Sequence, residues 1–285
     1  MRNKTKLYAI ALVSLIIITA FTFDKRHQEN KEQLKVDYSI TNTWELPAEL
    51  NEVSGISWVA DDLIACVQDE QGTIFIYDLK QKKIVKEISF AGAGDYEGIA
   101  VVGKDAYVMR SDGLLYHVKN YLNSNKKVSA SQTRFVAKNN MESLFFDQKN
   151  NSLLSIPKER DEDDQYKNIY QIALNTEKAE TKIFTKISME AALFKSFKDK
   201  KVYKTLNPSE IAINPKTNDV FVLEGKRPKL LTLGINGQLK KLYMLDKAIF
   251  TQPEGLTFSP DGRMFISNEA GKNSKANILE VVLQN

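Results

Sequence analysis

The amino-acid sequence predicts an all-β protein, a β-propeller of four-stranded blades closed by an N-terminal strand. Three observations predict this fold. A short motif recurs about every 45 residues, each copy opens a run of short apolar segments separated by turns, and no extended helical periodicity competes with them. With 285 residues, of which 42% are hydrophobic and 27% charged, the chain is long enough to bury one large core or two modest ones.

The recurring motif is a pair of small or acidic residues followed by an aliphatic residue. From one aliphatic residue to the next, the intervals are 43, 45, 67 and 45 residues, close to the length of a four-stranded blade except at the third interval. We therefore expect five blades, or six if the long interval hides further strands. The five copies are Ser54-Gly55-Ile56, Glu97-Gly98-Ile99, Glu142-Ser143-Leu144, Ser209-Glu210-Ile211 and Glu254-Gly255-Leu256.

The residues after each motif alternate between strands and turns. In the last copy, the type I turn Ser259-Pro260-Asp261-Gly262 separates residues 255–258 from residues 263–267. The second copy predicts three strands in the same way, at residues 98–102, 106–110 and 114–118.

Closure of the ring needs a strand from the front of the chain. Only 29 residues follow Leu256, and they end in a strand-like segment at residues 277–283. Residues 36–46 alternate well enough to supply the missing outer strand, so we expect them to latch the ring shut. The surplus of the long interval lies around residues 189–206, where the apolar spacing predicts a short helix. Since an insertion between two blades emerges beside the start of the next inner strand, we expect residues 187–206 to form a partial cover over that mouth of the central channel.

The N-terminus has the pattern of an exported, membrane-anchored protein. Three basic residues precede an uncharged run at residues 7–23, which is just long enough for a marginal membrane span. No clean small-x-small cleavage site follows, so we expect residues 1–23 to be a retained signal anchor in the cell membrane. Residues 24–35 are then a tether, and residues 36–285 an exported propeller. A cleaved signal peptide, giving a periplasmic or secreted protein, and a buried N-terminal helix remain as alternatives.

Charge and cysteine content exclude several classes of function. The formal charge of +4 comes entirely from residues 1–35, which hold seven basic and three acidic side chains. The rest of the chain is neutral and has no basic stripe, so we expect no nucleic-acid partner. Cys66 is the single cysteine, which rules out an intrachain disulfide and a cysteine metal site.

The blade geometry predicts an acidic site at one mouth of the central channel. The innermost strand starts on the face where the second strand ends, so each hairpin brings its own polar residues together there. Grouped carboxylates repel one another unless a cation neutralises them, and hard oxygen ligands suit calcium or magnesium. We therefore expect a divalent cation, calcium first, and an unidentified small-molecule or protein ligand at this face. The candidate ligands are Glu97, Glu142, Glu254, Asn268, Asp69 and Glu159.

Two other roles for these carboxylates stay open. The glutamates can be structural, binding backbone amides of the next blade with Lys158, Arg110 and Arg160 as counterions, or they can hold a cationic or polar small ligand without metal. A Ser-His-Asp apparatus is excluded, because His27 lies in the tether and His117 in a third strand.

A calcium-dependent hydrolase of esters, lactones or phosphates is the alternative function. It needs no histidine, and Asp69 or Glu159 would serve as its base. We favour a binding propeller, because no catalytic constellation is complete.

Five segments occur in a characteristic order. They are Asn51-Glu52-Val53-Ser54-Gly55-Ile56, Gln68-Asp69-Glu70-Gln71-Gly72-Thr73-Ile74-Phe75, Tyr96-Glu97-Gly98-Ile99-Ala100, Pro157-Lys158-Glu159-Arg160-Asp161 and Gln252-Pro253-Glu254-Gly255-Leu256. In this order they resemble the bacterial SdiA-regulated propeller family, over nearly all of residues 40–285. The resemblance implies an envelope-facing propeller with an N-terminal anchor, related to esterase-like and phytase-like propellers, and a calcium-binding face. One departure is Ser209-Glu210, where the family more often has a Ser-Gly pair, so Glu210 is not expected to match the other glutamates.

Overall fold

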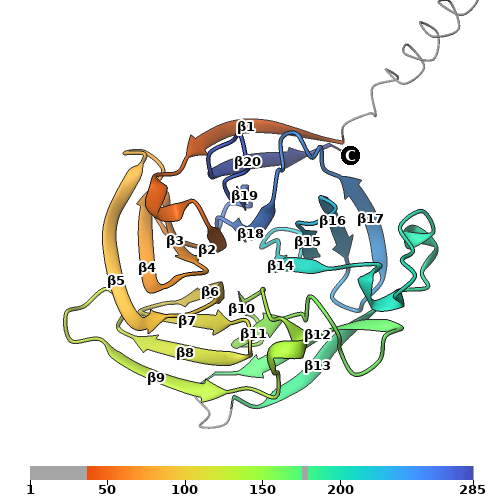
Figure 1. Ribbon diagram of the computed structural model, residues 1–285, viewed down its shortest axis with the longest axis horizontal. Coiled ribbons are helices and arrows are strands. Elements are labelled where there is room, and N and C mark those ends of the chain that lie inside the picture. The colour runs from red at the N-terminus through yellow and green to blue at the C-terminus, as the bar shows by residue number, and fades with distance from the viewer. Residues whose placement is uncertain (1–36, 175–178, 285) are drawn as a thin grey trace, which may run out of the picture. The chain divides into compact units, whose positions relative to one another are not determined.

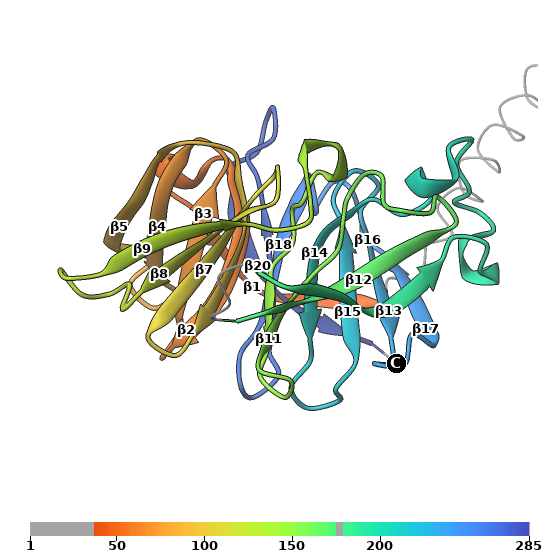
Figure 2. The ribbon, with the colours of Figure 1, turned by 90° about the horizontal axis from the view of Figure 1, so that it is seen from below.

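The computed structural model describes residues 37–174 and 179–284, which form a five-bladed β-propeller. Each blade is a four-stranded antiparallel sheet, and the five sheets surround a central axis (Figure 1). Seen from below, the blades stand side by side, with their strands running between the two faces of the disc (Figure 2). The predicted fold class and the count of five blades are therefore confirmed.

The first four blades follow one another along the chain, each running from its innermost strand to its outermost. Blade one comprises β2 (Val53–Ala60), β3 (Leu63–Gln68), β4 (Gln71–Asp78) and β5 (Lys83–Ala93). Blade two comprises β6 (Tyr96–Val102), β7 (Asp105–Arg110), β8 (Leu114–Lys119) and β9 (Lys127–Gln132). Blade three comprises β10 (Phe145–Asp147), β11 (Ser152–Ser155), β12 (Tyr166–Ala173) and β13 (Thr181–Ser188). Blade four comprises β14 (Pro208–Ile213), β15 (Val220–Glu224), β16 (Lys229–Leu233) and β17 (Leu239–Met244).

Blade five joins the two ends of the propeller. It comprises β18 (Pro253–Phe258), β19 (Met264–Asn268), β20 (Asn277–Leu283) and, as its outer strand, β1 (Tyr38–Glu45). β1 pairs with β20 in antiparallel register from Tyr38 opposite Leu283 to Glu45 opposite Asn277. The Trp44 indole nitrogen also donates a hydrogen bond to the carbonyl of Leu79 in blade one, at 2.8 Å. The predicted latch is therefore confirmed.

Apolar side chains of neighbouring blades pack together in five separate clusters. One cluster joins blades five and one through Phe265 and Ile278 of blade five and Tyr77 of blade one, all fully buried. Because each blade buries apolar side chains against both neighbours, the ring closes around a continuous series of cores.

The glycines of the repeated motif allow the inner strands to approach closely. A Cβ at Gly55 would lie 2.7 Å from the carbonyl oxygen of Glu97, and a Cβ at Gly98 would lie 2.8 Å from the backbone nitrogen of Leu144. Such contacts are too short for any side chain. The motif glycines therefore lie where neighbouring inner strands come closest together, and the channel is narrow at this level.

The insertion in the long interval does not cover the mouth of the channel as expected. It forms two short 3₁₀ helices, η3 (Ala192–Phe194) and η4 (Val202–Lys204), in place of one helix. Phe194 is fully buried in the cluster between blades three and four, and Arg227 of blade four donates to the carbonyl of Phe197 at 3.2 Å. Figure 1 shows the segment at the rim of the disc, beside β17. The apolar side chains that suggested a helix instead fill the space between two blades.

Two further 3₁₀ helices lie in loops, η1 (Ala48–Leu50) and η2 (Ala137–Asn139). The predicted signal anchor at residues 1–23 and tether at residues 24–35 lie outside the described residues. Within the described part of the chain, no helix has the length and apolar character that a membrane span requires.

Candidate functional site

A β-bulge marks the start of the innermost strand of each blade. In β6 the register slips by one residue between Tyr96 and Gly98, so Glu97 is the extra residue. The other four blades show the same slip in or just ahead of the inner strand. A bulge leaves its extra residue out of the ladder and turns its side chain toward a new direction. Two positions before the aliphatic residue of each motif lie Ser54, Glu97, Glu142, Ser209 and Glu254.

Three of these residues are glutamates that gather around one lysine at the mouth of the channel. Glu142 and Glu254 are only 5% and 7% exposed, and Glu97 is partly buried. The ammonium of Lys158 forms an ion pair with Glu142 Oε2. Asn140 donates a hydrogen bond to Glu142 Oε1 at 2.7 Å. Glutamates from blades two, three and five therefore share one counterion.

The raised pKa values of the three carboxyls show that this grouping of negative charge is electrostatically unfavourable. Burial raises the pKa of Glu97 to about 10, assisted by repulsion from Glu142, Asp95 and Glu254. Burial and repulsion from Glu254 raise the pKa of Glu142 to about 8, against the opposing effect of Lys158. Burial likewise raises the pKa of Glu254. The single ammonium does not neutralise the group.

The same grouping of charge makes Lys158 hold its proton more tightly. Burial alone would lower the pKa of Lys158, but attraction to Glu254, Glu142 and Glu97 raises it above its ordinary range. Lys158 therefore stays charged and acts as the internal cation of the mouth.

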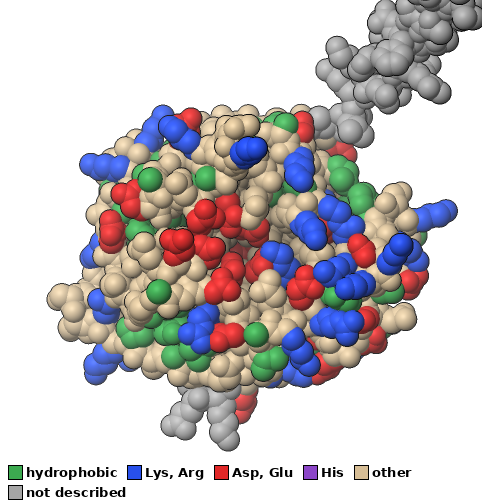
Figure 3. All heavy atoms as spheres, viewed as in Figure 1, with side chains coloured by type: hydrophobic (Ala, Val, Ile, Leu, Met, Phe, Trp, Pro, Cys, Tyr) green, Lys and Arg blue, Asp and Glu red, His purple; other side chains and the backbone are tan. Residues whose placement is uncertain are grey.

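Further carboxylates extend the negative surface from the mouth toward blades one and five. Glu269 has its pKa raised to about 8 by burial and by repulsion from Glu254, Glu52 and Asp69. Burial also raises the pKa of Asp69, with repulsion from Glu52, Asp95 and Glu70 adding to it. Figure 3 shows acidic side chains clustered around the centre of this face. We call Glu97, Glu142, Glu254 and Glu269, together with Lys158, the acidic mouth.

A second, fully buried lysine holds the segment that carries Lys158. The ammonium of Lys167 donates hydrogen bonds to the carbonyls of Pro157 at 3.2 Å and Lys158 at 2.7 Å, and to that of Glu159. Asn207 donates to the same Lys158 carbonyl at 3.0 Å. These hydrogen bonds from buried side chains therefore fix the backbone of the segment that carries Lys158. The sequence offers only a weak signal for Lys167, a lone lysine in the strand Tyr-Lys-Asn-Ile-Tyr.

Glu210 does not belong to the acidic mouth. It lies directly before the aliphatic residue of its motif, one position later than the other glutamates, and it is 1% exposed. Its Oε1 accepts hydrogen bonds from the backbone nitrogens of Leu144 and Ile211, both at 2.9 Å. Glu210 thus joins blade four to blade three, which is the structural role left open for such glutamates.

Two of the predicted ligands have partners away from the mouth. The fully buried Asn268 donates from Nδ2 to Asn277 Oδ1 at 2.9 Å, toward the outer part of blade five, while its Oδ1 has no hydrogen-bond partner among the described residues. Glu159 Oε1 lies 3.7 Å from the ammonium of Lys204, on the insertion. The structure therefore groups Glu97, Glu142 and Glu254, brings Asp69 close to Glu269 beside that group, and pairs Asn268 with Asn277 and Glu159 with Lys204.

The buried carboxylates of the acidic mouth are chemically suited to a cation, although they do not lie close enough together for three of them to share one ion. Buried carboxylate oxygens with excess negative charge are the ligands that calcium prefers. Across residues 37–174 and 179–284, no three acidic, histidine or cysteine side chains stand close enough to hold one metal ion together. Lys158 pairs with Glu142 in this arrangement, so an incoming ion competes with the ammonium.

Comparison with solved structures identifies the fold. Glutaminyl cyclase of Myxococcus xanthus superposes with a TM-score of 0.59 and 13% identity, over 87% of this chain and 96% of that chain. A Bacteroides thetaiotaomicron protein of unknown function gives 0.51 and 12%, over 81% and 58%. A streptogramin B lyase gives 0.49 and 10%, over 86% and 98%. At these identities, the likeness shows the fold alone.

No protein-family model matches the chain, and no curated relative matches it. The resemblance to the SdiA-regulated family therefore stays a prediction, carried by its five motifs.

Proposed function

We propose that this protein is a binding propeller whose acidic mouth takes up a divalent cation, with calcium as the first candidate. Glu97, Glu142 and Glu254 would hold the ion, and the ion would in turn receive a polar ligand or a partner protein. Residues 7–23 would keep the propeller at the outer side of the cell membrane, and the SdiA-regulated family is the family that this reading fits.

The observation that supports the proposal is the imbalance of charge at the mouth. Three glutamates from three blades converge on one ammonium, and Glu269 adds a fourth carboxyl beside them. A bound divalent ion supplies the positive charge that this group lacks and would restore the carboxyls to their ionised form. Since the three glutamates sit on bulges of inner strands, their backbone positions are fixed by the ring itself.

The hydrolase alternative would also need a base at the mouth to activate water. Glu159 is paired with Lys204, and Asp69 lies among carboxylates of blades one and two. Neither of the bases that the sequence suggested stands within the group of three glutamates. We therefore propose the binding function.

Thermal unfolding of the full chain with calcium tests the proposal. A ligand that binds only the folded state raises its stability by about 2.7 kcal/mol at a concentration of 100 times the dissociation constant. For a domain of this size, that corresponds to a rise of several degrees. We expect calcium to raise the unfolding temperature of the natural protein and to leave the triple variant Glu97→Gln, Glu142→Gln, Glu254→Gln unchanged.

The matched control is Glu87→Gln, a change of the same chemistry at an exposed position of β5. This variant should respond to calcium as the natural protein does. An equal response in the triple variant would place calcium elsewhere, and no response in the natural protein would remove the metal site.

A further inference from the structure

The far end of the central channel holds a second cavity of about 520 Å³, distinct from the acidic mouth. The inner strands begin at the acidic mouth and end at this cavity, so the two lie on opposite faces. All five inner strands contribute to it, through Ser57, Val101, Phe146, Ile213 and Thr257 among others. Its volume falls in the range of about 300–1,000 Å³ that small-molecule sites occupy.

Eight of the fifteen residues that line the cavity are apolar. Trp58, Val101, Phe145, Phe146 and Ile213 all line it, and each is only partly buried. Each also packs against one or two of the clusters between blades, so the interblade cores continue into the cavity wall. The apolar part of the cavity surface is thus continuous with the interblade cores, which suits a flat ring.

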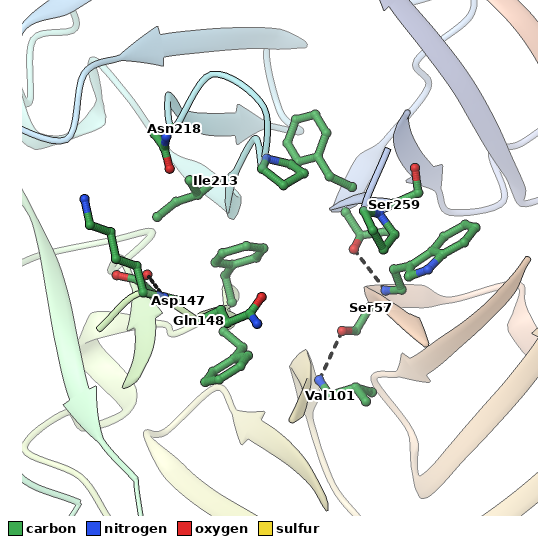
Figure 4. A pocket seen from close by; sticks show the side chains of 15 residues that line it. Ser57, Val101, Asp147, Gln148, Ile213, Asn218 and Ser259 are labelled. Atoms are coloured by element: carbon green, nitrogen blue, oxygen red, sulfur yellow. Dashed lines mark hydrogen bonds between the residues drawn. The ribbon is translucent and has the colours of Figure 1, made fainter. Parts of the chain in front are cut away.

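The hydroxyl groups of Ser57, Thr257 and Ser259 line the cavity, and the first two accept hydrogen bonds from backbone nitrogens of neighbouring blades. Ser57 Oγ accepts a hydrogen bond from the backbone nitrogen of Val101 at 3.1 Å, and Thr257 Oγ1 accepts one from that of Trp58 at 3.0 Å. Figure 4 shows the Ser57 bond at the cavity wall, with Ile213 and Gln148 pointing into the space between the strands. Since each oxygen is already an acceptor, its own proton is available to donate. These two hydroxyl groups can therefore donate to a ligand that accepts hydrogen bonds.

Charge on the wall is small and largely compensated. Asp147 accepts hydrogen bonds from the backbone nitrogens of Lys149 and Asn150, at 3.1 and 3.3 Å, and from the side chain of Asn150 at 2.5 Å. Asp147 is buried, whereas the side chain of Lys149 is exposed at the rim. An ionised ligand would lose its hydration here without gaining a buried counterion.

We propose that this cavity binds an uncharged, flat aromatic molecule that carries a carbonyl or similar acceptor oxygen. The ring lies against Phe145, Phe146 and Ile213, and the acceptor receives the hydroxyl proton of Ser57. This site lies at the opposite end of the inner strands from the acidic mouth and shares no residue with it, so the proposal stands independently of calcium binding.

A neutral fluorescent naphthalene ketone, 6-propionyl-2-dimethylaminonaphthalene, is the probe for this site. Trp44 and Trp58 are the two tryptophans of the chain, and Trp58 alone lines the cavity. We expect saturable, blue-shifted probe emission with the full chain, excited by energy transfer from tryptophan. A Trp44→Phe variant, with Trp58 as its remaining donor, should keep the energy transfer.

Two substitutions in the cavity test the location. Ile213→Arg, which places a guanidinium in the apolar space, and Gln148→Arg, at an exposed rim position that carries no core contact, should each weaken probe binding at least tenfold. The matched control is Ile249→Arg, at an isoleucine that is 40% exposed and does not line the cavity, and it should bind as the natural protein does. Gln148→Arg keeps the test valid if Ile213→Arg fails to fold.

The chemical class of the ligand is tested with Ser57→Ala and with an anionic probe. Loss of one neutral hydrogen bond should weaken binding about two- to tenfold. The sulfonate 1-anilinonaphthalene-8-sulfonate should bind more weakly than the neutral ketone. Absence of saturable binding by the natural protein, or equal binding by both arginine variants, would overturn the proposal, and tighter binding of the sulfonate would overturn the assignment of an uncharged ligand.

Discussion

Two glutamates at the start of inner strands differ by one position in the repeated motif, and this difference gives them different roles. Glu97 occupies a bulge and turns into the acidic mouth, whereas Glu210 stands one position later and accepts two backbone hydrogen bonds. The sequence shows the offset between the two motifs and thereby suggests that they differ. It does not show which backbone amides Glu210 meets, because Leu144 belongs to another blade.

Substitutions at these two glutamates should differ in their effect on stability. Glu210→Ala leaves two buried N–H groups without an acceptor, which costs about 1–3 kcal/mol for each group. Glu97→Gln removes a buried carboxyl that its neighbours repel, so in the absence of calcium the unfolding temperature should stay the same or rise. Chemical denaturation of both variants in a chelator measures this. A loss of stability in Glu97→Gln as large as that in Glu210→Ala would show that both glutamates are structural.

Lys158 decides how strongly the mouth attracts an external cation. If its ammonium competes with calcium for Glu142, the substitution Lys158→Met should tighten calcium binding at least about tenfold, because a nearby positive charge is removed. Calorimetric titration of calcium into the natural protein and the variant gives the two dissociation constants. Weaker binding in the variant would mean that Lys158 helps to form the site.

Among the elements, β1 has the largest effect on closure because it covers the edge of β20. The strand pairs along its whole length, and Tyr38 packs edge-on against Phe250 with ring centroids 5.4 Å apart. The alternation of residues 36–46 and the shortage of strands at the C-terminus were enough to predict this pairing. The position of the insertion was not predictable in the same way, because apolar spacing says that Phe194 is buried but not against which surface.

Removal of the latch should damage the fold severely. A chain that begins at Leu50 loses β1 and exposes the edge of β20, so we expect its unfolding temperature to fall by roughly 10 °C or its cooperative transition to disappear. The comparison is a chain that begins at Val36, followed by circular dichroism during heating. Equal unfolding temperatures for the two chains would contradict closure through β1.

At the scale of the whole molecule, the repeat period predicted the ring and the strand order predicted which residues share a face. Lys158 was expected as a counterion of these glutamates, and the structure pairs it with Glu142. The buried support from Lys167 and the apolar cavity at the far face depend on side-chain packing between blades. A period in the sequence carries no information about such packing.

The N-terminal segment adds a prediction about where the propeller resides. We expect the mature protein to fractionate with membranes and to keep residues 1–23, because no good cleavage site follows the apolar run. Mass spectrometry of the mature N-terminus, together with fractionation, checks this. A soluble periplasmic protein that begins between residues 21 and 36 would instead show a cleaved signal peptide.

Calorimetric titration of the full chain with calcium is the most direct test of the acidic mouth as a cation site. We expect saturable binding of one ion per chain, lost in the variant that carries Glu97→Gln, Glu142→Gln and Glu254→Gln and retained in Glu87→Gln. Magnesium, which demands a tighter octahedral arrangement, should bind more weakly. No detectable calcium binding by the natural protein, or the same binding by the triple variant, would show that the acidic mouth is not a calcium site.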